Sequence, residues 1–466
     1  MSLQYREAGT GGSSSSTIKG KLTAIGHFAT FLATLGLDYE KSGEDAICNE
    51  SILRQFGTYL IITTSADLGK QMAPDTATQY FSGTVMTLKK LYPTNPVFNP
   101  SLSWNSEVRS DIQRLITRRH IAEGLEVKDK AHGVGRLLMI DISKELLSVG
   151  TIKSIESRAI LCTSFHAVGR AGEVALLTWS CLYWNPNEEL LGGKWMQQKT
   201  TNVQEMTFFA DAESYEICEF HSLTCYLEVG GGSRGSRGAI GWKFPALSEI
   251  NASKAITTIL KDLSKRIDGL HSEVTATDIR VGSANDIVNA EGGGFEVAVA
   301  RGGWKAKGET ICALFEYYMN TTLSINIAGR ILSRFKNPRS PSYPPRFNSF
   351  VTSENKAKVM SMLGYLLDKR FHISVSPVLG SFAKVMFASL LQYHEPMQHT
   401  YGMDHIIVRY VIDSARKFNI SNLELTEWGN LVRRDVALRN AARNSSGSQS
   451  TDYAVHCNTV RQIVIT

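Results

Sequence analysis

Apolar residues recur every three to four positions through the first part of this chain, and this spacing is the strongest constraint on its fold. A Ser16-Thr17 capping signal precedes the first run, and Pro93 ends the third. The runs are marked by Ile18, Leu22, Ile25, Phe28, Leu32 and Leu35, by Ile52, Leu53, Phe56, Tyr59 and Leu60, by Tyr80, Phe81, Val85, Leu88 and Leu91, and by Val108, Ile112, Leu115 and Ile116. The sequence therefore predicts a small helical domain over residues 17–130.

A charged, glycine-containing stretch at residues 124–136 has the composition of an exposed linker. We expect a second domain over residues 137–330. Its helical patterns lie near residues 141–149, 153–168, 253–268, 277–290, 295–300 and 309–320. Between them, residues 190–210 have the pattern of a β-hairpin with Lys199 near its tip. The predicted fold class is mainly α with a small β-hairpin or sheet.

The remaining residues, 331–466, begin with a proline-rich connector and continue with further helical patterns. These patterns lie near residues 353–368, 379–392, 403–417 and 431–443. We therefore expect a helical C-terminal accessory region. At the other end of the chain, small polar residues predict a disordered tail over residues 1–16.

The composition is that of an ordinary globular protein in a reducing compartment. The chain has 7 cysteines, an odd number, and no two of them have CxxC spacing, which argues against disulfides and a zinc ribbon. No apolar run is long enough to span a membrane, and the N-terminus has no signal core. We expect an intracellular protein without a membrane partner, nuclear if the host is eukaryotic and otherwise cytoplasmic.

Basic residues gather in two segments, although the net charge of +6 permits nucleic-acid binding without establishing it. The first cluster comprises Arg109, Arg114, Arg118, Arg119, Lys128 and Lys130, and the second comprises Arg330, Arg334, Lys336, Arg339 and Arg346. Taken alone, each cluster has a simpler interpretation as the solvated face of a helix.

A scattered set of polar residues has the chemistry needed to break a DNA phosphodiester without a metal. Two guanidinium groups, Arg170 and Arg280, can neutralise the oxygens of a pentacoordinate phosphorane. The indole of Trp304 adds a neutral donor, and a lysine such as Lys199 can protonate the leaving oxygen. A tyrosine phenol at 317 or 318 can act as the nucleophile. Each residue alone has an ordinary structural explanation, so only the set is informative.

The set occurs in segments that resemble the tyrosine recombinases of the phage-integrase superfamily, above all the Cre-type members. The segments are Val168–Trp179 (VGRAGEVALLTW), Gln198–Thr200 (QKT), Thr277–Asp286 (TDIRVGSAND), Ala300–Trp304 (ARGGW) and Phe315–Met319 (FEYYM). Their order and separations are similar to those of the family. The motifs cover about residues 140–330, whereas residues 17–136 resemble the family's core-binding domain only in being helical.

The resemblance implies a role for each residue. Arg170 and Arg280 would be the catalytic arginines, and Lys199 would be the general acid. Glu173 would hold the site together without contacting the DNA. Trp304 would occupy a position that many members fill with histidine. Tyr318 would be the nucleophile, preferred over Tyr317 because the apolar Met319 follows it.

One position departs from the family pattern. The family usually has a histidine three residues before the second arginine, and here that residue is Thr277. A hydroxyl can donate a hydrogen bond to a phosphate but cannot accept a proton as a base near pH 7. Loss of a general base costs on the order of 10²–10⁴-fold in rate. His271 lies too far upstream to be assumed as a substitute.

The resemblance implies a site-specific DNA recombinase or integrase that cleaves and rejoins duplex DNA through a 3′-phosphotyrosine intermediate. It implies a homotetramer on DNA, phosphate contacts from the first basic cluster, and no cofactor or metal. The long C-terminal region is similar to that of recombinases from Crypton-like mobile elements. Two alternatives stay open: a catalytically inactive DNA-binding protein on the same fold, and, more weakly, an enzyme like type IB topoisomerases or hairpin-forming resolvases.

Overall fold

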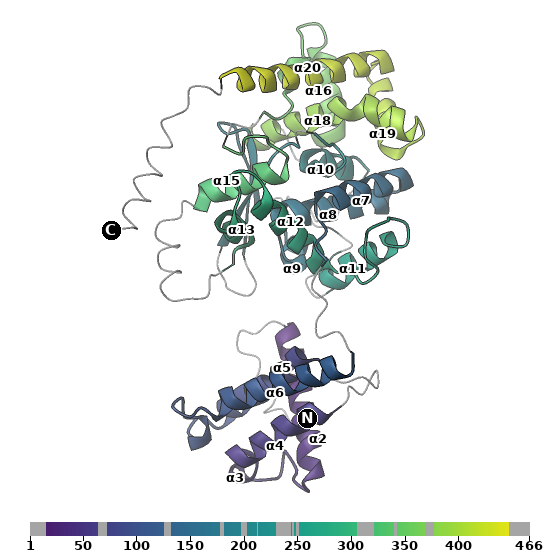
Figure 1. Ribbon diagram of the computed structural model, residues 1–466. Coiled ribbons are helices and arrows are strands. Elements are labelled where there is room, and N and C mark those ends of the chain that lie inside the picture. The colour runs from purple at the N-terminus through teal and green to yellow at the C-terminus, as the bar shows by residue number, and fades with distance from the viewer. Residues whose placement is uncertain are drawn as a thin grey trace, which may run out of the picture. The chain divides into compact units, whose positions relative to one another are not determined.

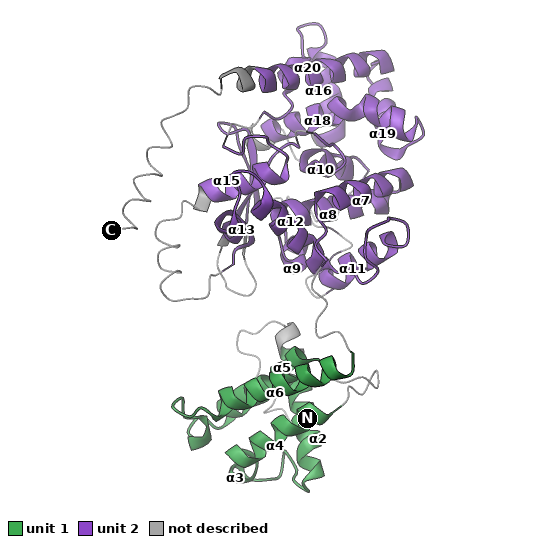
Figure 2. Ribbon diagram, viewed as in Figure 1, with its two compact units in different colours: residues 1–130 green, residues 131–466 purple. Residues whose placement is uncertain are grey.

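The computed structural model describes residues 15–63, 72–124, 132–177, 181–196, 203–211, 213–229, 244, 247, 251–304, 321–339, 343–368 and 377–446. The chain forms two compact units, residues 1–130 and 131–466, which are coloured separately in Figure 2. Both units are mainly helical, and the second adds a small antiparallel sheet, so the predicted fold class is confirmed. No helix within the described ranges combines the length and the apolar character that a membrane crossing requires.

The first unit is a helical domain built as the apolar spacing predicts. Its helices are α2 (Ser15–Thr34), α3 (Glu44–Ile47), α4 (Glu50–Ile62), α5 (Pro74–Leu91), the short 3₁₀ helix η1 (Pro96–Phe98) and α6 (Trp104–Ala122). Asn49 caps α4 by accepting the Ile52 amide, and Pro74 begins α5, where a missing N–H costs nothing. Phe28, Phe56 and Phe81 are fully buried in the shared core. Residues 1–14 of the predicted tail lie outside the described residues, and α2 begins at Ser15.

The second unit contains the segments that carry the family resemblance. In chain order its first helices are α7 (Arg136–Val149), α8 (Ile152–Ala167), α9 (Ala171–Ala175), α10 (Glu219–Glu228), α11 (Ala252–Leu263), α12 (Ala276–Asn289), α13 (Phe295–Gly302) and α15 (Thr321–Leu332). The helices α8 and α10 pack against each other near the centre of the unit (Figure 1). The expected helix at 309–320 lies outside the described residues.

The sheet has the strand order β1–β2–β3 and is antiparallel throughout. Strands β2 (Leu190–Met196) and β3 (Val203–Phe208) form the predicted hairpin, with Leu191 opposite Phe208. The hairpin tip, including Lys199, lies outside the described residues. Strand β1 (Leu182–Asn185) was not predicted, and it pairs with the other edge of β2. A Cβ atom on Gly192 would lie 2.2 Å from the Tyr183 ring, which explains a glycine within β2.

The C-terminal helices of the second unit share its core. They are η3 (Phe347–Ser349), α16 (Lys356–Leu363), the π-helix η4 (Gly364–Asp368), α18 (Pro377–Tyr401), α19 (Ile406–Arg416) and α20 (Asn422–Ser446). The Phe382 ring on α18 stacks on Trp184 of β1, with centroids 5.8 Å apart. An accessory role for residues 331–466 stays a prediction.

The segment that enters the second unit lies along α12 and fixes its position. The Val134 amide donates to the Asp278 carbonyl at 2.7 Å, and the Arg136 amide donates to the Asp286 carboxylate at 2.8 Å. A Cβ atom on Gly282 would lie 2.1 Å from the Val134 backbone, so only glycine allows this approach. The glycine of the Arg280-Val281-Gly282 motif therefore serves packing.

We predict that Gly282→Ala lowers the free energy of unfolding by about 1–3 kcal/mol, because the added methyl group must displace backbone. Gly364→Ala is the matched control, since a Cβ atom there meets nothing within 4 Å and the backbone is helical. We expect this control to be neutral or to stabilise by about 0.5–1 kcal/mol. Urea unfolding of the two variants measures the difference, and equal values would contradict the packing role of Gly282.

Candidate catalytic site

Arg170 is held in place by Glu173 at the start of α9. The Arg170 backbone N–H donates to Glu173 Oε2 at 2.8 Å, and its side-chain Nη1 donates to Oε1 at 2.6 Å. Glu173 is buried, while about a quarter (27%) of the Arg170 side chain is exposed. One carboxylate thus closes the helix N-terminus and orients a guanidinium group that solvent and ligands can reach.

Arg280 lies in the middle of the site. It is on α12, whose start is fixed by a capping box between Thr275 and Asp278. Its Nη2 donates to the Gly302 carbonyl at 2.6 Å, and its Nε–H is buried without a hydrogen-bond partner among the described residues. Burial and, to a lesser extent, the Arg170 charge lower the pKa of Arg280 against the opposing effect of Glu173, and the pKa that results is about 10. Arg280 stays charged at neutral pH, and its charge and that of Arg170 act on each other.

Trp304 covers Arg280 because two glycines precede it. The Arg280 guanidinium lies 4.6 Å from the centre of the Trp304 ring, within the range of a cation–π contact. Gly303 adopts a left-handed conformation (φ 58°), and the Trp304 amide donates back to the Val299 carbonyl at 3.1 Å. A Cβ atom on Gly302 would lie 2.5 Å from the indole. The Gly302-Gly303-Trp304 motif therefore ends α13 and folds the indole back over its last turn.

Thr277 lies one helical turn before Arg280 and is exposed. No hydrogen bond or ring contact joins it to Arg170, Glu173 or Trp304 in the described part of the chain. His271 is engaged elsewhere, because its ring stacks on His132 with centroids 4.2 Å apart and its Nδ1 accepts the Glu273 amide. Neither residue supplies a base to the site in this conformation.

Five of the predicted site residues belong to segments that the structure does not describe. Lys199, Tyr317, Tyr318, Lys128 and Lys130 lie outside the described residues. The four arginines predicted to contact DNA from residues 109–119 are on α6. They are Arg109 and Arg118, which are exposed, Arg114, which is ion-paired with Asp111 at 2.6 Å, and Arg119, whose Nη1 donates to the Ile61 carbonyl at 3.0 Å.

Sequence reasoning missed Arg301, which connects three elements beneath the site. Its guanidinium is fully buried and donates to the carbonyls of His166, at the end of α8, and Thr207, on β3. Burial lowers the pKa of Arg301 to about 9, so it stays charged at neutral pH. Its own carbonyl accepts from the Gln204 amide. Arg301 therefore links the helix that precedes Arg170, the strand of the hairpin and the helix that precedes Trp304.

We predict that Arg301→Met lowers the free energy of unfolding by about 3 kcal/mol, because two buried carbonyls lose their donors. The control is Arg416→Met, since Arg416 and its partner Asp413 are exposed and such surface pairs contribute less than about 1 kcal/mol. Urea unfolding of the full chain gives both values. A loss below about 1 kcal/mol for Arg301→Met would show that this network does not hold the site together.

The arrangement suits an anion and does not suit a metal ion. Two guanidinium groups and an aromatic ring come from three separate elements, and one carboxylate, Glu173, is already committed to Arg170. Within the described ranges, no group of three or more His, Cys, Asp or Glu residues is placed to hold a metal ion. An oxyanion such as a phosphate diester would satisfy the free Arg280 donor and reduce the repulsion between the two arginines.

No family model matches the chain, and no curated protein matches it. Among solved structures, the chain is similar to one described as a Flpe–Holliday junction complex. The two are 11% identical with a TM-score of 0.35, and the alignment covers 78% of this chain and 96% of that chain.

Proposed function

We propose that this protein cleaves and rejoins duplex DNA as a site-specific recombinase. The observation that supports this most strongly is that Arg170 and Arg280, which are far apart in the chain, lie close enough for the charge of Arg170 to lower the pKa of Arg280. Glu173 fixes the first arginine, and the Gly302 carbonyl fixes the second beneath Trp304. Arginines fixed in advance of the reaction stabilise a developing phosphorane without reorganisation during it.

In the proposed reaction, the Tyr318 oxygen attacks the phosphorus and the bond to the 5′-oxygen breaks. A 3′-phosphotyrosine and a free 5′-hydroxyl result, with Lys199 protonating the leaving oxygen. Tyr317 is the second choice of nucleophile. A 5′-hydroxyl from a partner strand then attacks the phosphotyrosine and restores the phosphodiester. The covalent link conserves the bond energy, so no cofactor is required.

DNA would be bound through its phosphates by the basic residues of the first unit. Arg109 and Arg118 on α6 are exposed, which suits backbone contacts. Arg114 and Arg119 have protein partners that a phosphate would have to compete with. Lys128 and Lys130 complete the proposed set, and affinity should fall steeply with salt. We further propose a homotetramer on two DNA sites, with 17–130 and 137–330 as the core-binding and catalytic domains and 331–466 as an accessory region.

A second candidate function is DNA binding without catalysis. Thr277 favours it, because a hydroxyl stands where the related enzymes have a basic imidazole. Because Thr277 is exposed and cannot act as a base, solvent would have to accept the proton of the phenol. In the enzyme this would make cleavage slow, and in the second candidate cleavage would be absent.

A suicide substrate separates the two candidates. A duplex selected from a random pool for binding is nicked near the contacted phosphates, so that the released strand diffuses away and traps the covalent adduct. We expect an adduct with the full chain that is resistant to detergent, absent in Tyr318→Phe and retained in Tyr317→Phe. Peptide mapping would identify the tyrosine. Tight binding without an adduct would favour the non-catalytic protein.

Two further variants test the roles of individual residues. Arg280→Ala should reduce adduct formation by about 10²–10³-fold, as expected for loss of an oxyanion donor. Arg409→Ala is the matched control, because Arg409 is an exposed arginine on α19. Thr277→His should accelerate cleavage by about 10²-fold or more by restoring a base. An unchanged rate in Thr277→His would contradict the proposed cause of slow cleavage.

A further inference from the structure

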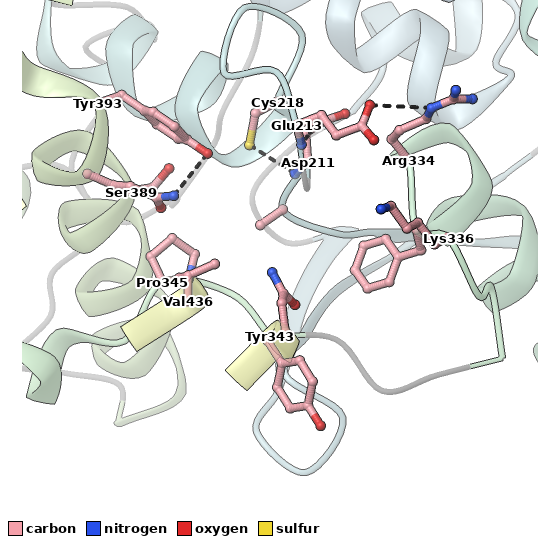
Figure 3. A pocket seen from close by; sticks show the side chains of 14 residues that line it. Asp211, Glu213, Cys218, Arg334, Lys336, Tyr343, Pro345, Ser389, Tyr393 and Val436 are labelled. Atoms are coloured by element: carbon pink, nitrogen blue, oxygen red, sulfur yellow. Dashed lines mark hydrogen bonds and ion pairs between the residues drawn. The ribbon is translucent and has the colours of Figure 1, made fainter. Parts of the chain in front are cut away.

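A cavity in the second unit, apart from the candidate catalytic site, contains none of the residues proposed to act on DNA. Its volume is about 320 Å³, at the lower end of the range of small-molecule sites. It lies between the end of β3, the turn that follows α15, and the helices α18 and α20. Figure 3 shows Tyr393 and Ser389 on one side and Arg334 and Lys336 on the other.

One wall of the cavity carries buried polar atoms that lack partners. Ser389 on α18 is fully buried, and its Oγ has no hydrogen-bond partner among the described residues. Oε1 of Gln392, one turn later on α18, is also buried without a hydrogen-bond partner among the described residues. The amide nitrogen of Gln392 donates to the Tyr393 hydroxyl at 3.1 Å. Buried acceptors without donors are costly and rare in folded proteins. A ligand with N–H or O–H groups would satisfy both atoms.

The mouth of the cavity carries one cation, Lys336, that has no acidic partner among the described residues. Asp211 is neutralised by Arg136, whose two guanidinium nitrogens lie 2.7 and 2.9 Å from its oxygens. Arg334 pairs with Glu213 at 3.3 Å in an exposed ion pair. Lys336 is exposed and forms no ion pair in the described part of the chain. The excess positive charge at this mouth favours an anionic group on the ligand.

Two aromatic residues also belong to the lining of the cavity. Phe335 and Tyr343 line it. Arg334, which precedes Phe335, adopts a left-handed backbone conformation (φ 60°), uncommon for a residue other than glycine and often retained where function requires it. This turn caps α15 and carries Phe335 and Lys336 to the cavity. An aromatic wall favours a flat ring in the ligand.

We propose that this cavity binds a nucleoside monophosphate or a small phosphorylated heteroaromatic compound of the same chemistry. Lys336 and Arg334 would hold the phosphate, Phe335 would contact the ring, and Ser389 and Gln392 would accept hydrogen bonds from the base. The site is separate from Arg170 and Arg280, so the inference does not depend on DNA cleavage. A bound ligand would connect α15 with α18 and α20.

Isothermal titration of the full chain with AMP, GMP, CMP and UMP tests the proposal. We expect at least one nucleotide to bind with one-to-one stoichiometry and a Kd below about 100 µM, within the affinity range of a modest small-molecule site. The corresponding nucleoside and inorganic phosphate should each bind at least about 10-fold more weakly, because each satisfies only part of the site. A hundredfold excess of nucleotide over Kd should raise the Tm by about 5 °C.

Two variants show whether binding occurs in this cavity. Ser389→Ala should weaken nucleotide binding by about 10-fold, yet leave the Tm of the free protein unchanged or higher, because it removes a hydroxyl without a partner. Lys336→Gln should weaken binding by about 5- to 10-fold. Lys254→Gln, at an exposed position on α11, is the control and should bind normally. Binding weaker than about 1 mM for all four nucleotides, or unchanged affinity in both cavity variants, would overturn the proposal.

Discussion

The hydrogen bonds of the buried Arg301 guanidinium hold together the elements that carry the candidate catalytic residues. It donates to the carbonyls of His166 and Thr207, which belong to elements far apart in the chain. Three segments meet at this residue: the end of α8, strand β3 and the last turn of α13. A buried charge is costly unless it is fully hydrogen-bonded, so these carbonyls and the arginine require one another.

The positions of the exposed polar groups follow from this network. Arg170 lies just beyond α8, and Glu173 fixes its guanidinium. Trp304 lies just beyond α13, and the carbonyl of Gly302 accepts from Arg280. The energetic consequence is two neighbouring cations, with Glu173 as the one compensating carboxylate among the described residues. Such a site is better satisfied by an anion than by water, which is why we connect it with phosphate chemistry.

Apolar spacing predicted most helices because most of them have one buried and one exposed face. It did not reveal α10, because every residue of that helix is buried and no polar face marks its period. Strand β1 is only four residues long, too short for an alternating pattern to stand out, although the Asn185-Pro186-Asn187 turn that follows it was a usable signal. The hairpin of β2 and β3 was predictable from its alternating residues on both sides of a polar tip.

The polar residues that face a ligand could be predicted from the sequence, and the buried arginine that supports them could not. Arg170, Arg280 and Trp304 lie in recognisable motifs, so their chemistry could be inferred before their proximity. Arg301 lies within the Ala300–Trp304 motif, and the signal that it is structural is its place directly after the apolar run Val297–Ala300. The cavity beside α18 left no pattern, because Lys336 lies after α15 and Ser389 and Gln392 lie on α18, and only folding brings these two elements together.

We propose that Arg170 and Arg280, from distant segments of the chain, hold the same DNA phosphate. A crystal structure of the full chain with a selected duplex, in the Tyr318→Phe variant, measures this directly. We expect the guanidinium groups of Arg170 and Arg280 to lie within about 3.2 Å of the non-bridging oxygens of the same phosphate. Two arginines on different phosphates, or a duplex bound without either, would contradict it.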